Sequence, residues 1–202
     1  RPDQLRDFLT RSRWFSGKGR DFRVSEHRSV PLSDSTWIEL VEVSYAGGDQ
    51  ECYQLPLVTY EWPQDRLSHA LVEFVDGQPV YDALHDREAM ALWLRGFASG
   101  ASYDGLRFHR LGDPALDVAN HSTLFAGEQS NSSVTFGEES QLKVFRKVTP
   151  GSNPDVEILR ALTEVNGAHI ARLYGWVTLA DGGEELQLAI LQEYIRTATN
   201  GW

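Results

Sequence analysis

The sequence has little cysteine, no excess of positive charge and no long apolar run. Cys52 is the one cysteine among 202 residues, so an internal disulfide and a cysteine-based metal site are excluded. We find no signal peptide and no segment apolar enough to span a bilayer. The net charge of −10 argues against general binding to nucleic acid or to anionic membranes. We therefore expect a cytoplasmic protein.

The composition is that of a globular protein. Hydrophobic residues make up 41% of the chain and include six tryptophans, which is enough for one large or two small cores. The chain begins at Arg1 without a methionine and stops at Trp202 in a segment that looks unfinished. We expect it to be part of a longer protein.

The first 78 residues predict a small α+β unit. Leu5, Phe8 and Leu9 share one face of a helix over 2–12. Four strand patterns follow at 22–30, 36–45, 52–60 and 69–74. We expect the helix to lie across a curved antiparallel sheet, an N-terminal cap over 1–78.

The segment 13–20 joins the helix to the first strand and is rich in basic residues and glycine. A phosphate loop is one interpretation, but no strand precedes the segment. We favour a second interpretation, in which Trp14 and Phe15 anchor the helix to the sheet.

Residues 79–121 are predicted to be a helical linker region. Apolar spacing indicates a helix over 80–100, and 101–121 have the composition of a connector. Asp82, His85 and Asp86 resemble a metal or acid–base cluster, but a solvated charged face is favoured at this position.

The segment from Ser122 to Glu157 contains most of the candidate binding residues. It reads as two strands joined by a small polar loop, then a strand that contains Lys143, then a helix with Asn153 as N-cap. A lysine inside an apolar strand needs a partner, and Glu157 in the first helical turn offers one. The alternative is a lysine whose stem snorkels on a solvent face. The loop can present N–H groups and hydroxyls to phosphates; it consists of Gly127, Glu128, Gln129, Ser130, Asn131 and Ser132.

Two further strands, at 170–178 and 186–194, complete the pattern. Residues 122–202 then form five antiparallel strands with one inserted helix, the arrangement of a protein-kinase-like small lobe that ends at its hinge. The hinge backbone at Gln192, Glu193 and Tyr194 would bind an adenine edge. For Glu193 a solvated strand-end charge is an equal alternative.

These motifs together resemble the N-terminal half of actinobacterial maltokinases, in the aminoglycoside-phosphotransferase-like kinase family. The resemblance is carried, in order, by WFSGKGR at 14–20, EQSNSS at 128–133, LKVFR at 142–146, NPDVE at 153–157 and LQEY at 191–194. It implies a cap, a small lobe and transfer of the ATP γ-phosphate to maltose, giving maltose 1-phosphate for α-glucan (glycogen) synthesis in the trehalose pathway. It also implies ATP binding by the loop, Lys143, Glu157 and the hinge.

The resemblance also implies what this segment lacks. The family's large lobe holds the HGD-type catalytic aspartate and the Mg²⁺ ligands, and neither motif occurs here. We expect no catalytic residue and no metal site in this segment, which alone would be inactive. Three alternatives stay open: another sugar such as glucosamine, an aminoglycoside-like acceptor, or a non-catalytic nucleotide-binding module. Association with trehalose synthase, or a homodimer, is a further expectation.

Overall fold

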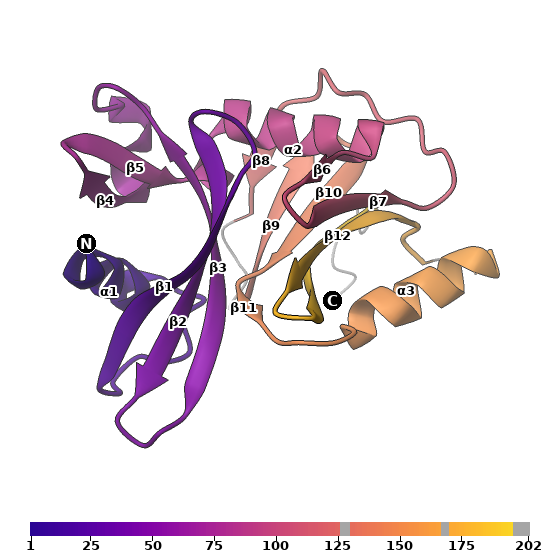
Figure 1. Ribbon diagram of the computed structural model, residues 1–202. Coiled ribbons are helices and arrows are strands. Elements are labelled where there is room, and N and C mark those ends of the chain that lie inside the picture. The colour runs from indigo at the N-terminus through magenta and orange to yellow at the C-terminus, as the bar shows by residue number, and fades with distance from the viewer. Residues whose placement is uncertain (126–129, 167–169, 196–202) are drawn as a thin grey trace, which may run out of the picture.

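The computed structural model describes residues 1–125, 130–166 and 170–195 as two antiparallel sheets side by side (Figure 1). The cap, in indigo and purple, occupies one side of the molecule, and the lobe, in orange and yellow, occupies the other. The predicted α+β class, with a cap followed by a kinase-like lobe, is confirmed. None of the described helices is long and apolar enough to cross a membrane.

The cap consists of one helix on a curved sheet. Helix α1 (Pro2–Arg11) begins with proline at its first turn and buries Leu5, Phe8 and Leu9, as its periodicity predicts. Phe15 is buried and Trp14 packs beside it against the same core, so the anchoring interpretation of 13–20 is supported. The sheet order is β1 (Phe22–Pro31), β2 (Thr36–Tyr45), β3 (Gln50–Thr59), β5 (Gln78–Asp82) and β4 (Leu71–Val75), with a 3₁₀ helix, η1 (Asp65–Ala70), before β4.

The prediction that a helix begins at Val80 is wrong. Asp76 and Gly77 have φ angles of 51° and 82°, which form a tight hairpin turn from β4 into β5. Val80 and Tyr81 are buried and pair with β3, so tertiary pairing overrides the helical spacing of Tyr81 and Leu84. Leu84 lies in a short 3₁₀ turn, η2 (Ala83–His85).

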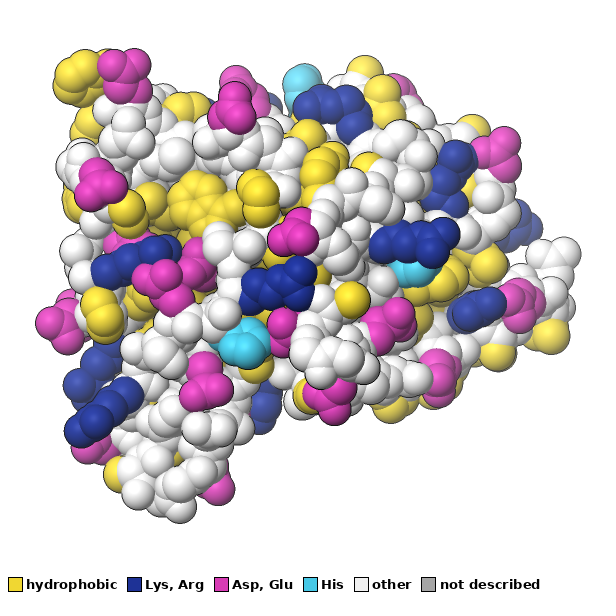
Figure 2. Space-filling model, viewed as in Figure 1, with side chains coloured by type: hydrophobic (Ala, Val, Ile, Leu, Met, Phe, Trp, Pro, Cys, Tyr) yellow, Lys and Arg dark blue, Asp and Glu magenta, His cyan; other side chains and the backbone are white. Residues whose placement is uncertain are grey.

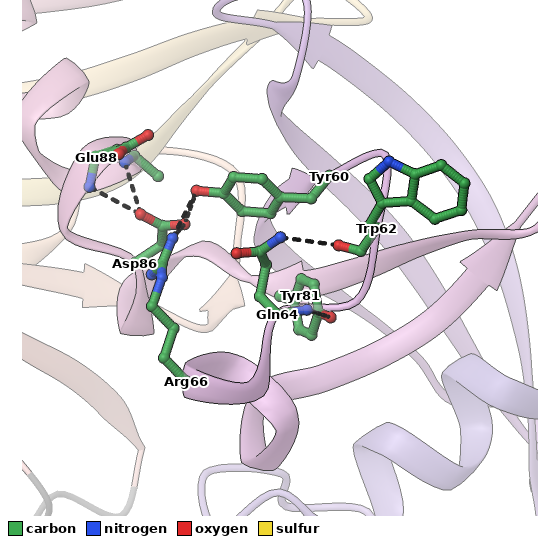
Figure 3. Close-up of polar contacts among 8 residues, drawn as sticks. Tyr60, Trp62, Gln64, Arg66, Tyr81, Asp86 and Glu88 are labelled. Atoms are coloured by element: carbon green, nitrogen blue, oxygen red, sulfur yellow. Dashed lines mark hydrogen bonds and ion pairs between the residues drawn. The ribbon is translucent and has the colours of Figure 1, made fainter.

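Helix α2 (Arg87–Ser99) is fixed at its start by Asp86 (Figure 3). One carboxylate oxygen accepts the backbone N–H of Glu88 at 2.8 Å, which caps the helix. The other oxygen accepts the hydroxyl of Tyr60 and lies 3.5 Å from the Arg66 guanidinium. Asp82 and Asp86 are both buried, so the favoured interpretation of a solvated charged face is wrong.

The lobe has the five predicted strands and two more. Asp104 and Gly105, with φ angles of 34° and 82°, turn β6 into β7, in a region predicted to be a connector. These two strands extend the sheet beyond β12. The order is β6 (Ser102–Tyr103), β7 (Leu106–Arg110), β12 (Leu173–Asp181), β13 (Glu184–Glu193), β10 (Ser140–Phe145), β9 (Asn131–Phe136) and β8 (Ser122–Leu124).

The inserted helix α3 (Pro154–Glu164) packs lightly beside β12 and extends away from the body of the molecule (Figure 1). Asn153 accepts the N–H of Asp155 at 2.9 Å, which confirms the predicted cap. Val156 is buried in this helix, whereas Ile158 is 56% exposed.

Cap and lobe share one hydrophobic core and a strand connection. Buried residues of both parts form a continuous cluster, and β11 (Lys147–Val148), directly after β10, pairs with cap strand β3. The buried amide of Gln54 donates to the carbonyl oxygens of Phe145 and Leu188. These contacts join the two parts into one packed body. On the face drawn in Figure 2, acidic and basic side chains are interspersed over both parts.

Glu51 holds this junction electrostatically. Its carboxylate accepts hydrogen bonds from the hydroxyls of Tyr45 and Tyr53, at 2.6 and 2.7 Å, and lies 2.6 Å from Lys147 Nζ. Burial alone would raise the pKa of Glu51, but the hydrogen bonds from Lys147, Tyr45 and Tyr53 lower it to about 2. Because the pKa of Glu51 is lower in the folded protein, ionised Glu51 stabilises the fold fully above the ordinary value of 4.5. This stabilisation is lost as the pH falls from there towards 2.

We predict that Glu51→Gln removes part of the acid sensitivity of folding. Urea unfolding at pH 7 should show that the variant loses about 1–2 kcal/mol of unfolding free energy, a value reduced because solvent screens the half-exposed Lys147. At about pH 3 the difference between variant and unaltered protein should be smaller. The matched control is Glu61→Gln at an exposed position. Equal losses at both pH values would contradict the assignment.

Candidate functional site

Lys143 lies in the middle of the lobe sheet. On β10 it is half-buried and directly opposite Ser133 of β9 and Ile190 of β13. Directly opposed residues share a face of an antiparallel sheet, so Ser133 and Ile190 flank Lys143 on the same side. Val156 of α3 packs against Ile190 on this side. The strand lysine and the inserted helix therefore share one face, which we call the lysine face.

Glu157 lies in the first turn of α3 and is exposed. Within the described residues, no ion pair of 4.0 Å or less joins its carboxylate to Lys143. The weak packing of α3 explains the separation, because Val156 is its buried residue. The pairing of Lys143 with Glu157 therefore stays a prediction.

The polar loop is described in part. Gly127, Glu128 and Gln129 lie outside the described residues, and Ser130 is exposed just before β9. Asn131 and Ser132 begin β9 rather than continue the loop. Ser132 faces away from Lys143, because it precedes Ser133 and neighbouring strand residues alternate between faces.

Ser133 has an unexpected position beside Lys143. It is 1% exposed, and its hydroxyl has no hydrogen-bond partner among the described residues. An unsatisfied buried hydroxyl is uncommon and calls for an explanation such as a bound ligand or water. Sequence reasoning placed Ser132 in the site and missed Ser133, because the strand register decides which serine faces the lysine.

The predicted hinge is held within the lobe. The N–H of Glu193 donates to Arg172 O at 2.7 Å, and the N–H of Tyr194 donates to Glu139 O at 3.0 Å. The Glu193 carboxylate accepts the N–H of Arg172 at 3.3 Å, and the amide of Gln192 donates to Gln141 at 3.4 Å. Glu193 is half-buried rather than fully solvated. An adenine edge would need other backbone groups, or would displace these bonds.

Arg146 lies on the opposite face, between lobe and cap. Its guanidinium is 2% exposed; Nη2 is 2.7 Å from Asp82 Oδ2, and Nε donates to Ser132 Oγ at 2.8 Å. The group lies 4.7 Å from the ring centroid of Trp14. A buried charge is costly unless it is paired, so cap residues stabilise the start of β9 through this side chain. No local pattern indicates this pair, since Asp82 precedes Arg146 by 64 positions in the chain.

A metal site is not apparent in the described part of the chain. No group of three or more His, Cys, Asp or Glu side chains there could hold an ion. We assign no Mg²⁺ ligand to these residues.

The fold and the lysine face define a cap joined to a kinase-like N-terminal lobe. Residues 8–86 match the model of the maltokinase N-terminal cap domain. This segment is therefore similar to the maltokinase cap domain, in agreement with the sequence resemblance.

Solved structures of glucosamine kinase have the same fold over nearly the whole chain. A complex described with glucosamine, ADP and inorganic phosphate matches with a TM-score of 0.62 and 15% identity. A second crystal form matches with a TM-score of 0.58 and 16% identity. Each match covers 97% of this chain and 42% of the glucosamine kinase chain. This chain thus spans less than half the length of those enzymes.

We predict strong energetic coupling between Asp82 and Arg146. Either Asp82→Asn or Arg146→Gln leaves a buried charge without its partner and should cost about 3–5 kcal/mol. The double variant should cost clearly less than the sum, as urea unfolding of all four proteins would reveal. The exposed pair Arg160 and Glu164 is the control, with a coupling of about 0.5 kcal/mol or less. Additive losses for Asp82 and Arg146 would contradict the pairing.

Proposed function

We propose that this chain is the cap and ATP-holding lobe of an ATP-dependent sugar kinase that converts maltose and ATP to maltose 1-phosphate and ADP. The observation that carries the proposal is the half-buried Lys143 beside the unpartnered hydroxyl of Ser133, on the sheet face that α3 partly covers. The match of residues 8–86 to the maltokinase cap domain favours maltose as the acceptor.

Phosphoryl transfer depends mainly on positioning and on stabilising negative charge. In our proposal, Lys143 binds the α- and β-phosphates of ATP and Glu157 orients Lys143. The loop at 127–132 covers the phosphates with its N–H groups, and Gln192, Glu193 and Tyr194 form the hinge beside the adenine. Ser133 adds a hydroxyl at the phosphates, a role that sequence reasoning did not assign.

The remaining chemistry belongs to a second lobe. The acceptor hydroxyl attacks the γ-phosphorus, ADP leaves, and a carboxylate base takes the hydroxyl proton. We propose that this base and the Mg²⁺ ligands follow the hinge in the complete protein. The segment alone would hold nucleotide without turnover.

Glucosamine is the second candidate acceptor, because the fold matches that of glucosamine kinases. The pathway follows from the first candidate: maltose 1-phosphate would feed α-glucan and glycogen synthesis in the cytoplasm. Association with trehalose synthase, or a homodimer, belongs to the same proposal.

We predict that Lys143→Ala lowers kcat in the complete protein by about 100-fold or more, because a cation at the phosphates is lost. The assay is ADP release with maltose first in a panel of sugars that includes glucosamine. Thermal unfolding should be nearly unchanged, since Lys143 has no ion-pair partner in the described part. Lys18→Ala, at an exposed lysine of the cap, is the control and should keep full activity. Near-normal turnover of Lys143→Ala would sink the assignment.

We predict opposite effects of Ser133→Ala on stability and on nucleotide use. Removal of an unsatisfied buried hydroxyl should leave the nucleotide-free protein equally stable or stabilise it by about 1 kcal/mol. The KM for ATP should rise, because the hydroxyl no longer binds phosphate. Ser132→Ala is the matched control; it should destabilise the protein through Arg146 while it changes the KM for ATP less. An unchanged KM in Ser133→Ala would remove Ser133 from the site.

A further inference from the structure

A cavity of about 310 Å³ lies at the junction of cap and lobe, away from the lysine face. Its walls come from the end of α1 and the turn after it, from η1 and η2, and from the start of β9. Ser132 and Arg146 contribute the lobe side. Because Ser132 and Lys143 face opposite sides of the sheet, this cavity lies on the face opposite Lys143 and Ser133. Asn131 and Ser132, at the end of the proposed phosphate loop, also line it.

The described residues that line the cavity carry a net positive charge. The charged and titratable ones among them are Arg11, Arg13, His69, Asp82, His85 and Arg146. Asp82 is the one carboxylate among the described lining residues, and its ion pair with Arg146 balances both charges. Arg11 and Arg13 add two positive charges, in a protein whose net charge is −10. Such a local concentration of cationic groups attracts small anions.

Hydrogen-bond donors also line the cavity. Arg146 Nη1 is buried and has no partner among the described residues, although Nε and Nη2 are bonded. The three groups that contact this guanidinium, on Asp82, Ser132 and Trp14, all line the cavity. His69 and His85 are joined by a hydrogen bond of 3.1 Å, which leaves each ring with a second nitrogen. Arg11 donates to a neutral acceptor, the carbonyl oxygen of Leu71.

We propose that this cavity binds the phosphate group of a small anion, either inorganic phosphate or a phosphorylated metabolite. Arginine guanidinium groups suit phosphate oxygens, because their planar forks donate two parallel hydrogen bonds. A bound phosphate would lie between the cap arginines and the lobe strand that carries Ser132. The proposal stands independently of the sugar acceptor and of the kinase assignment.

The test is calorimetric titration of the complete protein with inorganic phosphate at fixed ionic strength. The double variant Arg11→Gln with Arg13→Gln removes two exposed charges from the cavity wall and leaves the buried Arg146 in place. We expect phosphate to bind the unaltered protein saturably, and we expect the double variant to bind it at least tenfold more weakly. Thermal unfolding serves as the check that the variant is folded.

Two control proteins locate the site. Arg6→Gln with Arg20→Gln removes the same charge from exposed cap positions outside the cavity and should keep phosphate affinity. Lys143→Ala should keep it too. Loss of binding in Lys143→Ala together with retention in the Arg11 and Arg13 variant would place the anion at the nucleotide site and overturn the proposal. No saturable binding to the unaltered protein would also overturn it.

The source of the phosphate is settled by a second titration, with glucose 6-phosphate as probe. Tighter binding of this sugar phosphate than of inorganic phosphate, lost in the Arg11 and Arg13 variant, identifies a phosphorylated metabolite as the ligand. Weaker binding of the sugar phosphate identifies inorganic phosphate. Both results support the cavity as a phosphate site.

Discussion

The buried ion pair between Arg146 and Asp82 is the constraint on which the arrangement of the two sheets depends. Arg146 follows the lysine strand directly, and Asp82 ends the last strand of the cap sheet. Neither charge tolerates burial alone, so the pair fixes how the lobe meets the cap. The next two residues after Arg146 form β11 on cap strand β3, and the amide of Gln54 binds two lobe carbonyls beside it. The cap therefore packs onto the lobe as part of its core.

Strand alternation then divides the chemistry between two faces. Lys143 and Ser133 face the side that α3 partly covers, whereas Ser132 and Arg146 face the cap. The neighbouring residues Ser132 and Ser133 therefore face opposite sides of the sheet. We propose that the lysine face binds the phosphates of ATP, whereas the face towards the cap carries the basic cavity lined by Ser132 and Arg146. The two sites meet at the start of strand β9, where Asn131 and Ser132 end the proposed phosphate loop and line the cavity.

The sequence predicted those parts of the fold that depend on local pattern. The apolar spacing of α1 and the Asn153 cap of α3 are readable from a few neighbouring residues. Val80 and Tyr81 were misread, because their partners on β3 are far away in the chain and strand pairing outweighs helical spacing. Asp82 looked solvated for the same reason, since Arg146 lies 64 positions later. The dipeptide Asp104-Gly105 was a usable hairpin signal in the region read as a connector.

In our proposal, the lysine face binds the phosphates of ATP. The most direct test treats the complete protein with an adenosine that carries a reactive sulfonyl fluoride in place of its phosphates, followed by peptide mass mapping. We predict covalent labelling of Lys143, protection by excess ATP, and no labelling of Lys147 on the cap-facing strand β11. Labelling of other lysines with Lys143 unmodified, or labelling of Lys143 that ATP does not prevent, would contradict it.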